Sequence, residues 1–235
     1  MNKRSKTTLI TNLLLLLIFG FVAISGFMPE KILPMSGGNS TTAIYNGNKN
    51  NPNVSIMVNV YENTDVVLKM MEVFKSKKVN ATFFVGGCWA DDNANALNEM
   101  VKNGFEIGNH GYFHKDHAKL SYEKNIEEIS VTERIINALC GYKTNLFAPP
   151  SGSFSKNTLN ACFDMEYQVI MWSKDTIDWR DSDKKTLYSR ATKNATNGDL
   201  ILMHPKQHTL EILPDVIDFY LSSGFNLVSV SKNLE

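Results

Sequence analysis

The sequence contains little cysteine and no excess of charge of either sign. Its three cysteines, Cys88, Cys140 and Cys162, have no C-x-x-C spacing. A disulfide scaffold and a thiolate zinc site are therefore both disfavoured. Acidic and basic residues number 24 each, so nothing indicates a nucleic acid as partner, whereas a polar, neutral ligand such as a carbohydrate stays possible. The sequence also lacks an evident internal repeat.

A long apolar run near the N-terminus contrasts with this balanced composition. Three basic residues within the first six positions precede a run from Leu9 to Met28, which at about 20 residues is long enough to cross a bilayer as a helix. We predict that residues 1–28 form a retained signal-anchor with the N-terminus in the cytoplasm. A cleaved signal peptide is the alternative, and both readings place the rest of the chain outside the cytoplasm.

Residues 29–51 have the composition of a flexible linker. They are rich in Pro, Gly, Ser, Thr and Asn, which favour turns and offer little to bury. The apolar triplet 43–45 is a candidate for a short strand. We therefore predict a single globular domain over residues 52–235, in the form of a monomer.

Strand-like and helix-like segments alternate throughout this domain. The first, Val54–Val60, is apolar and rich in β-branched residues, as a buried parallel strand should be. Alternation of this kind indicates a parallel sheet, either open or closed into a barrel. The expected strands are 54–60, 81–85, 105–108, 145–147, 168–172, 199–203 and 226–230, and the expected helices begin near 64 and cover 91–102, 121–140, 155–163, 184–194 and 210–222.

Polar side chains recur where these strands end, and in parallel α/β folds that edge of the sheet carries the chemistry. His110 and His114 follow the third strand. Positions i and i+4 lie on one side of a helical turn, so the two imidazoles can approach one metal ion. The other candidates at strand ends are Asn59, Glu62, Asp175, Asp178, Trp179 and His204.

Five segments in this order carry a resemblance to a known family. They are Ala81–Gly87, Ile107–His114, Phe147–Ser153, Trp172–Trp179 and Gly198–His204. From about Asn53 to its C-terminus the chain resembles the polysaccharide deacetylases with a NodB-homology domain, carbohydrate esterase family 4. The resemblance implies an irregular (β/α) barrel of about seven parallel strands. It also implies a bacterial cell-wall glycan, peptidoglycan or chitin-like, as the substrate whose N-acetyl groups are hydrolysed.

The resemblance assigns roles by position. A divalent metal, usually zinc, is held in this family by one Asp and two His, and it activates water. The metal ligands here would be His110 and His114. The general acid would be His204 with Asp175 as its partner. The walls of the substrate pocket would be Trp179, Leu202 and Pro150.

The first motif departs from the family pattern. Asn59 stands where the family has its base Asp, Val60 stands where it has the ligand Asp, and Ala148 replaces the Arg that pairs with the base. The changes fit one another, because an Arg beside a missing carboxylate would be a poorly paired charge. The leading hypothesis is that metal-dependent hydrolysis is retained, with Glu62 as the catalytic carboxylate and Asp116 or His117 as third ligand. The other is that the domain has lost catalysis and binds a glycan or a wall-assembly partner.

Other residues are given ordinary structural roles. We expect His117 and His208 on the surface and Met70 and Met71 in a helix core. Trp179 is equally consistent with core packing.

Overall fold

The computed structural model describes residues 41–235, so the apolar segment predicted as an anchor lies outside the described residues. No helix within 41–235 is long and apolar enough to cross a membrane. The strands are β1 (Asn53–Val60), β2 (Thr82–Val85), β3 (Glu106–Asn109), β4 (Leu146–Phe147), β5 (Gln168–Val169), β6 (Lys174–Asp175), β7 (Leu200–Met203) and β8 (Asn226–Leu227).

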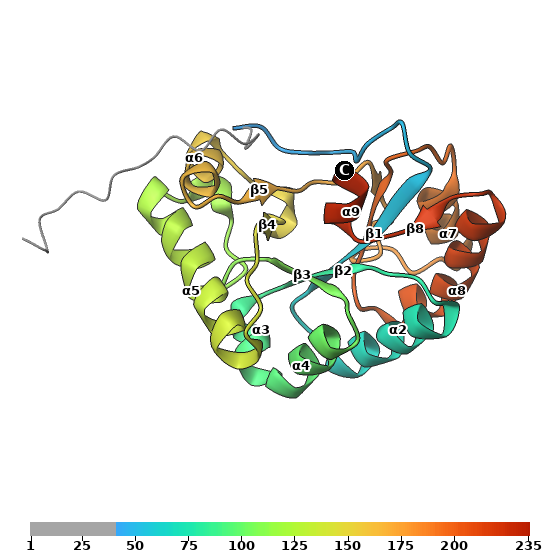
Figure 1. Ribbon diagram of the computed structural model, residues 1–235, viewed down its shortest axis with the longest axis horizontal. Helices are drawn as coiled ribbons and strands as arrows, with labels where there is room; N and C mark the ends of the chain where they lie inside the picture. The colour runs from blue at the N-terminus through green and yellow to red at the C-terminus, as the bar shows by residue number, and fades with distance from the viewer. Residues whose placement is uncertain (1–40) are drawn as a thin grey trace, which may run out of the picture. The chain divides into compact units, whose positions relative to one another are not determined.

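These strands form one sheet in the order β5-β4-β3-β2-β1-β7-β6, and β8 pairs with β1. Every pairing between them is parallel. The sheet curls into a half-barrel, as the alternation and the resemblance predict (Figure 1). The helices are α2 (Thr64–Lys77), α3 (Gly87–Asp92), α4 (Ala94–Lys102), α5 (Tyr122–Cys140), α6 (Lys156–Asp164), α7 (Lys184–Thr192), α8 (Gln207–Ser222) and α9 (Val230–Leu234).

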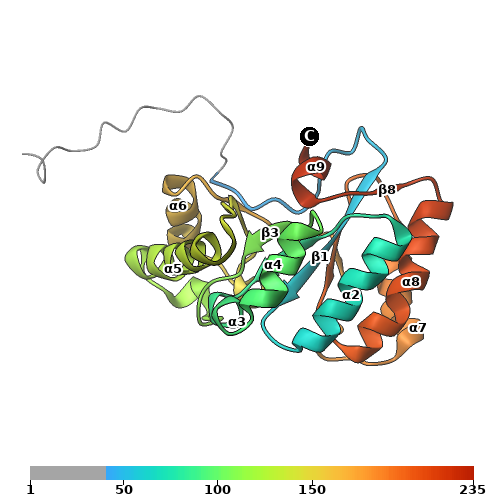
Figure 2. The same cartoon turned by 60° about the horizontal axis from the view of Figure 1, so that its bottom comes forward.

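Strand β1 separates two apolar cores through its two-residue period. Val58 and Val60 face outward into the larger core, beneath α2, α4 and α8, which cover the outer face (Figure 2). Met57 faces inward, where it joins Phe84 and Leu202 in a smaller cluster. Because side chains alternate along a strand, Asn59 belongs with Met57 on the inner face, at the carboxyl end of β1.

The inner face is packed closely around one glycine. A Cβ on Gly108 of β3 would lie 2.3 Å from the ring of Phe84, so this position accepts no side chain without displacement of the ring. The close approach keeps β2 and β3 in register, with Phe84 opposite Gly108. It also lets the chain continue to His110 on the same inner face.

Part of the predicted linker is bound to the domain. Ile44 pairs with Ile170 in a parallel bridge, and the amides of Gly47 and Asn48 donate to the carbonyls of Gly198 and Asn233. The packed part of the chain therefore begins before Pro52.

Besides the strand expected over 168–172, which ends at Val169, and β6, which was not expected, two predicted elements differ from those observed. The helix expected over 91–102 is two helices, α3 and α4, because Asn93 between them has φ −129° and ψ 41°. The strand expected over 226–230 ends at Leu227, and Ser229 then caps α9 by accepting a hydrogen bond from the Lys232 amide. Neither change alters the edge of the sheet that carries the polar residues.

Candidate functional site

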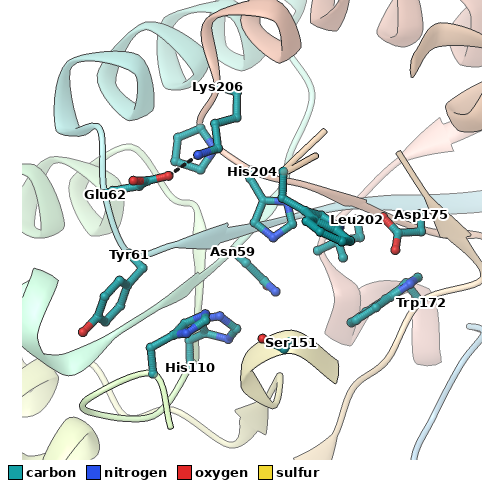
Figure 3. A pocket seen from close by; sticks show the side chains of 13 residues that line it. Asn59, Tyr61, Glu62, His110, Ser151, Trp172, Asp175, Leu202, His204 and Lys206 are labelled. Atoms are coloured by element: carbon teal, nitrogen blue, oxygen red, sulfur yellow. Dashed lines mark hydrogen bonds and ion pairs between the residues drawn. The ribbon is translucent and has the colours of Figure 1, made fainter. Parts of the chain in front are cut away.

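A pocket of about 500 Å³ opens at the carboxyl ends of the strands (Figure 3). Strands β1, β6 and β7 supply side chains to it, and the loops after β1, β3, β4, β5, β6 and β7 supply the rest. Its lining residues are Asn59, Tyr61, Glu62, His110, His114, Ser151, Trp172, Asp175, Trp179, Leu202, His204, Pro205 and Lys206. The separate polar strand ends of the sequence therefore do meet in one place.

His204 follows β7 and is held by Asp178, which is buried and does not line the pocket. Its Nδ1 is 2.7 Å from Asp178 Oδ1, and its backbone amide donates to Oδ2 at 2.7 Å. Burial alone would raise the pKa of Asp178, but the hydrogen bonds from His204 and Thr209 lower it below its usual value. The carboxylate therefore stays ionised and fixes the imidazole with Nε2 free.

The predicted partner of His204 was Asp175, and that assignment is wrong. Asp175 Oδ1 accepts a hydrogen bond from the amide of Ile177, within a turn in which Ile177 has φ 57°. This left-handed residue reverses the chain direction, so Asp178 rather than Asp175 reaches His204. Asp175 still lines the pocket, half-buried at one end.

His110 and His114 come together, but not on a helical turn. The loop between them bends at Gly111, φ 73°, and His114 itself has φ 53°, and the two ring centroids are 5.2 Å apart. The Nδ1 of His110 lies 2.7 Å from the carbonyl oxygen of Ala148, so Nδ1 donates and Nε2 is left as an acceptor. Burial, with His114 nearby, lowers the pKa of His110 to about 3, which keeps it neutral.

The three substituted family positions have clear places in the structure. Asn59 enters the pocket between His110 and His204 (Figure 3), and its Oδ1 is buried without a hydrogen-bond partner. Val60 faces the outer core. Ala148 is buried in the inner apolar cluster. The positions that the resemblance assigns to the base, the ligand and the arginine thus carry a neutral amide and two packed apolar side chains.

Glu62 lines the mouth of the pocket, where it forms an ion pair with Lys206 (Figure 3). Its side chain is 52% exposed, so it lies at the solvent edge. Tyr61 is on the same loop and its ring lies 4.9 Å from that of His114. Glu62 therefore lies near the histidines, but its carboxylate is paired with Lys206.

Aromatic and apolar side chains form the opposite wall. Leu202 is buried at the pocket floor, and Trp179 is 57% exposed, which rules out the alternative that it packs in the core. Pro150, predicted as a wall, is buried outside the lining, and its neighbour Ser151 lines the pocket instead. Gly152 allows this arrangement, because a Cβ there would lie 2.7 Å from the Trp172 ring.

A third metal ligand is not supplied by the residues proposed for it. Asp116 binds Ser153 and Lys119 on the surface, and His117 is fully buried, with Nδ1 2.7 Å from Asn125 Oδ1. Across residues 41–235, no three His, Cys, Asp or Glu side chains gather where they could hold a metal ion. Catalytic zinc requires three protein ligands, so the donors present do not fit the metal predicted from the resemblance.

Both histidines expected on the surface are placed differently. His117 packs against Phe147, with ring centroids 4.9 Å apart, and its Nε2 has no partner. His208 is half-buried, and its Nε2 lies 2.8 Å from the carbonyl oxygen of Asp178. Residues the sequence did not single out for the pocket are Tyr61, Ser151, Trp172, Pro205 and Lys206. The signals for them were resemblance and position, since Trp172 begins a segment that carries the resemblance and each of the others lies next to or two residues from a chosen residue.

Comparison with known proteins agrees with this geometry. Residues 46–170 match the family model for polysaccharide deacetylase. The chain is 35% identical over 192 residues to the uncharacterised protein YlxY of Bacillus subtilis, covering 82% of this chain and 60% of YlxY, so it spans less than two thirds of that relative. It is 27% identical to a peptidoglycan-N-acetylglucosamine deacetylase of Bacillus cereus, covering 79% of this chain and 70% of that protein.

Among solved structures, wild-type BA3943 of Bacillus anthracis, described as a CE4 family pseudoenzyme, superposes with a TM-score of 0.81 and 32% identity over 83% of this chain and 70% of its own. A BA3943 mutant described as having restored enzymatic activity superposes equally well, with a TM-score of 0.81 and 30% identity over 83% of this chain and 72% of its own. The matched family model, the half-barrel and the histidines at its strand ends lead to one conclusion: the chain belongs to the polysaccharide deacetylase family.

Proposed function

We propose that this domain binds an N-acetylated cell-wall glycan in its pocket without hydrolysing it. The observation that carries the proposal is the chemistry at the end of β1, where Asn59 enters the pocket and Val60 faces away from it. An amide takes up no proton near neutral pH, and a valine binds no metal. The similarity to a CE4 family pseudoenzyme supports the same reading.

A structural role accounts for the hydrogen-bonded pair of His204 and Asp178 without catalysis. Asp178 also accepts a hydrogen bond from the hydroxyl of Thr209 at 2.6 Å, and its carbonyl oxygen is bound by His208. These bonds tie the loop before α7 to the start of α8. A buried carboxylate with such partners is costly to lose, so the pair persists for structural reasons.

A glycan suits the remaining lining. The half-buried Trp172 and the exposed Trp179 offer flat apolar faces with polar edges. His110 and Asn59 supply uncharged hydrogen-bonding groups to the same pocket. Peptidoglycan is the candidate polymer, since the Bacillus cereus relative is named for it.

A second candidate function is hydrolysis of the N-acetyl group, as the resemblance implies for a divalent-metal enzyme with His204 as general acid. The oriented pair of His204 and Asp178 favours it. It would require a carboxylate to replace Asn59, and Glu62 is paired with Lys206. The first candidate needs no such rearrangement.

The test separates binding from hydrolysis. The protein is titrated with the tetramer of N-acetylglucosamine and with peptidoglycan fragments, and acetate release is assayed in parallel with added zinc. We expect saturable binding, no acetate, and binding weaker by between about twofold and about tenfold in Trp179→Ala, since aromatic contacts contribute about 0.5–1.5 kcal/mol beyond area burial. Phe163→Ala, an exposed aromatic outside the pocket, is the matched control. Acetate release that disappears in His204→Ala would establish the second candidate instead.

The location proposed for this activity is the extracytoplasmic face of a bacterial membrane. The basic tip and apolar run of residues 1–28 support it, and a cell-wall polymer would be within reach there. Protease accessibility of the domain on intact protoplasts tests this placement, and protection from the protease would contradict it.

A further inference from the structure

We infer that the pocket distinguishes acetylated from deacetylated glycan, and that Asn59 is the residue that reads the acetamido group. The inference rests on the proposed function, because it concerns what the bound sugar carries. The domain would then recognise the acetylation state of the glycan as well as the glycan itself.

Asn59 is 4% exposed, and its Oδ1 is buried with no hydrogen-bond partner. Leaving such an acceptor unpaired is unfavourable, and few buried polar groups in proteins are left in this state. The inner face around it is otherwise apolar at Met57 and Leu202. An apolar residue at 59 would therefore pack there without this penalty, so the amide has a use that the protein alone does not satisfy.

The position of the amide indicates its ligand. Asn59 points into the space between His110 and His204, with Ser151 on the opposite side (Figure 3). An asparagine amide both donates and accepts; Figure 3 shows its nitrogen at the pocket end, and rotation about the Cβ–Cγ bond exchanges the nitrogen with Oδ1. An acetamido group offers the matching carbonyl and N–H, and Leu202 and Trp172 lie on the adjacent wall, where its methyl can be buried.

Electrostatics at the pocket centre act against the deacetylated form. Removal of the acetyl group leaves an amine, which is protonated at pH 6.5 and only donates hydrogen bonds. Of the two carboxylates among the lining residues, Glu62 is bound to Lys206 at the mouth, and Asp175 lies beyond Leu202 from Asn59 (Figure 3). The ammonium would therefore face the imidazole of His110 and an amide rather than an anion.

Substitution by aspartate should reverse this preference. Asn59→Asp keeps the shape of the side chain but removes the donor and adds a negative charge, which attracts an ammonium group and repels a carbonyl oxygen. Asn59→Leu removes the amide without adding charge and should abolish the preference without reversing it. Asn95→Asp, an exposed position on α4, is the control for the same chemical change elsewhere.

The experiment uses the full-length protein in mild detergent with EDTA at pH 6.5, and thermal unfolding confirms that each variant is folded. Calorimetry compares the tetramer of N-acetylglucosamine with the tetramer of glucosamine. We expect the wild type and Asn95→Asp to bind the acetylated tetramer at least about tenfold more tightly, the effect of about one to two net hydrogen bonds. Asn59→Asp should favour the glucosamine tetramer.

The possible results test the preference for acetylated glycan separately from glycan binding itself. Equal affinity of the wild type for both tetramers would overturn the reading of acetylation while leaving glycan binding in place. An unchanged preference in both Asn59→Asp and Asn59→Leu would remove Asn59 as the reader. Failure of the wild type to bind either tetramer would overturn this inference together with the proposed function.

Discussion

Replacement of Asp178 by asparagine tests which aspartate organises the pocket. Asp178 Oδ2 accepts from the backbone amide of His204 and the hydroxyl of Thr209, while Oδ1 is bound to the imidazole. In Asp178→Asn one oxygen becomes an NH₂ group, which faces either the backbone N–H of His204, which cannot accept, or the imidazole Nδ1, which can accept only as the other tautomer. The hydroxyl of Thr209 can rotate and accept instead.

The magnitude follows from these contacts. Three hydrogen bonds to a buried carboxylate lose its charge, and one of them is lost or forces the imidazole into its other tautomer, so we expect a loss of about 3 kcal/mol of unfolding free energy. This corresponds to a decrease in Tm of about 6–12 °C for a chain of this size. The matched control is Asp175→Asn, whose Oδ1 can still accept from Ile177, and which should cost less than about 1 kcal/mol.

Urea unfolding at pH 7, followed by tryptophan fluorescence, measures both variants. Because the pKa of folded Asp178 lies below its ordinary value, its contribution is present above the unfolded pKa of about 3.9 and is lost as pH falls through the folded pKa. The difference between wild type and Asp178→Asn should therefore narrow below about pH 4. If Asp175→Asn proves as destabilising as Asp178→Asn, the reasoning about the turn at Ile177 is refuted.

Three other changes give measurable results. Burial lowers the pKa of His117, so the wild type should lose stability as pH falls below about 6.5. In His117→Gln the Tm should decline less steeply between about pH 7 and 5. An identical decline in the two proteins would contradict this. Asn59→Asp adds a carboxylate beside His110, so zinc should bind at least about tenfold more tightly by chelator competition; unchanged affinity would show that Asn59 lies outside ligand distance. Gly108→Ala forces a Cβ against Phe84 and should cost about 1–3 kcal/mol in thermal unfolding, whereas an unchanged Tm would mean that the ring moves freely.

The fold was predictable from the sequence because its signals are local. The apolar, β-branched run around Val58 identifies a buried strand, and the spacing of Met70 and Phe74 identifies the helix that covers it; both are buried as expected. The existence of the site was predictable for the same reason. Polar residues at several strand ends must meet when those strands are parallel neighbours.

The partners within the site were not predictable in the same way. Whether Asp175 or Asp178 reaches His204 depends on the left-handed conformation of Ile177, and a β-branched residue gives no sequence signal for that conformation. His117 is buried through contacts with Asn125 and Phe147, which belong to elements distant in the sequence.

The place of β1 in the sheet has a consequence for how the chain folds. β1 is the first strand to be synthesised, yet it pairs with β7 and β8, which are the last. Until those strands arrive, one edge of a nearly all-buried strand has no partner, and such edges are prone to pair with other chains. Folding through contacts so distant in sequence is slow. This protein should therefore depend on a chaperone while it is being made, and shortening it from the C-terminus should cause aggregation well before any pocket residue is removed.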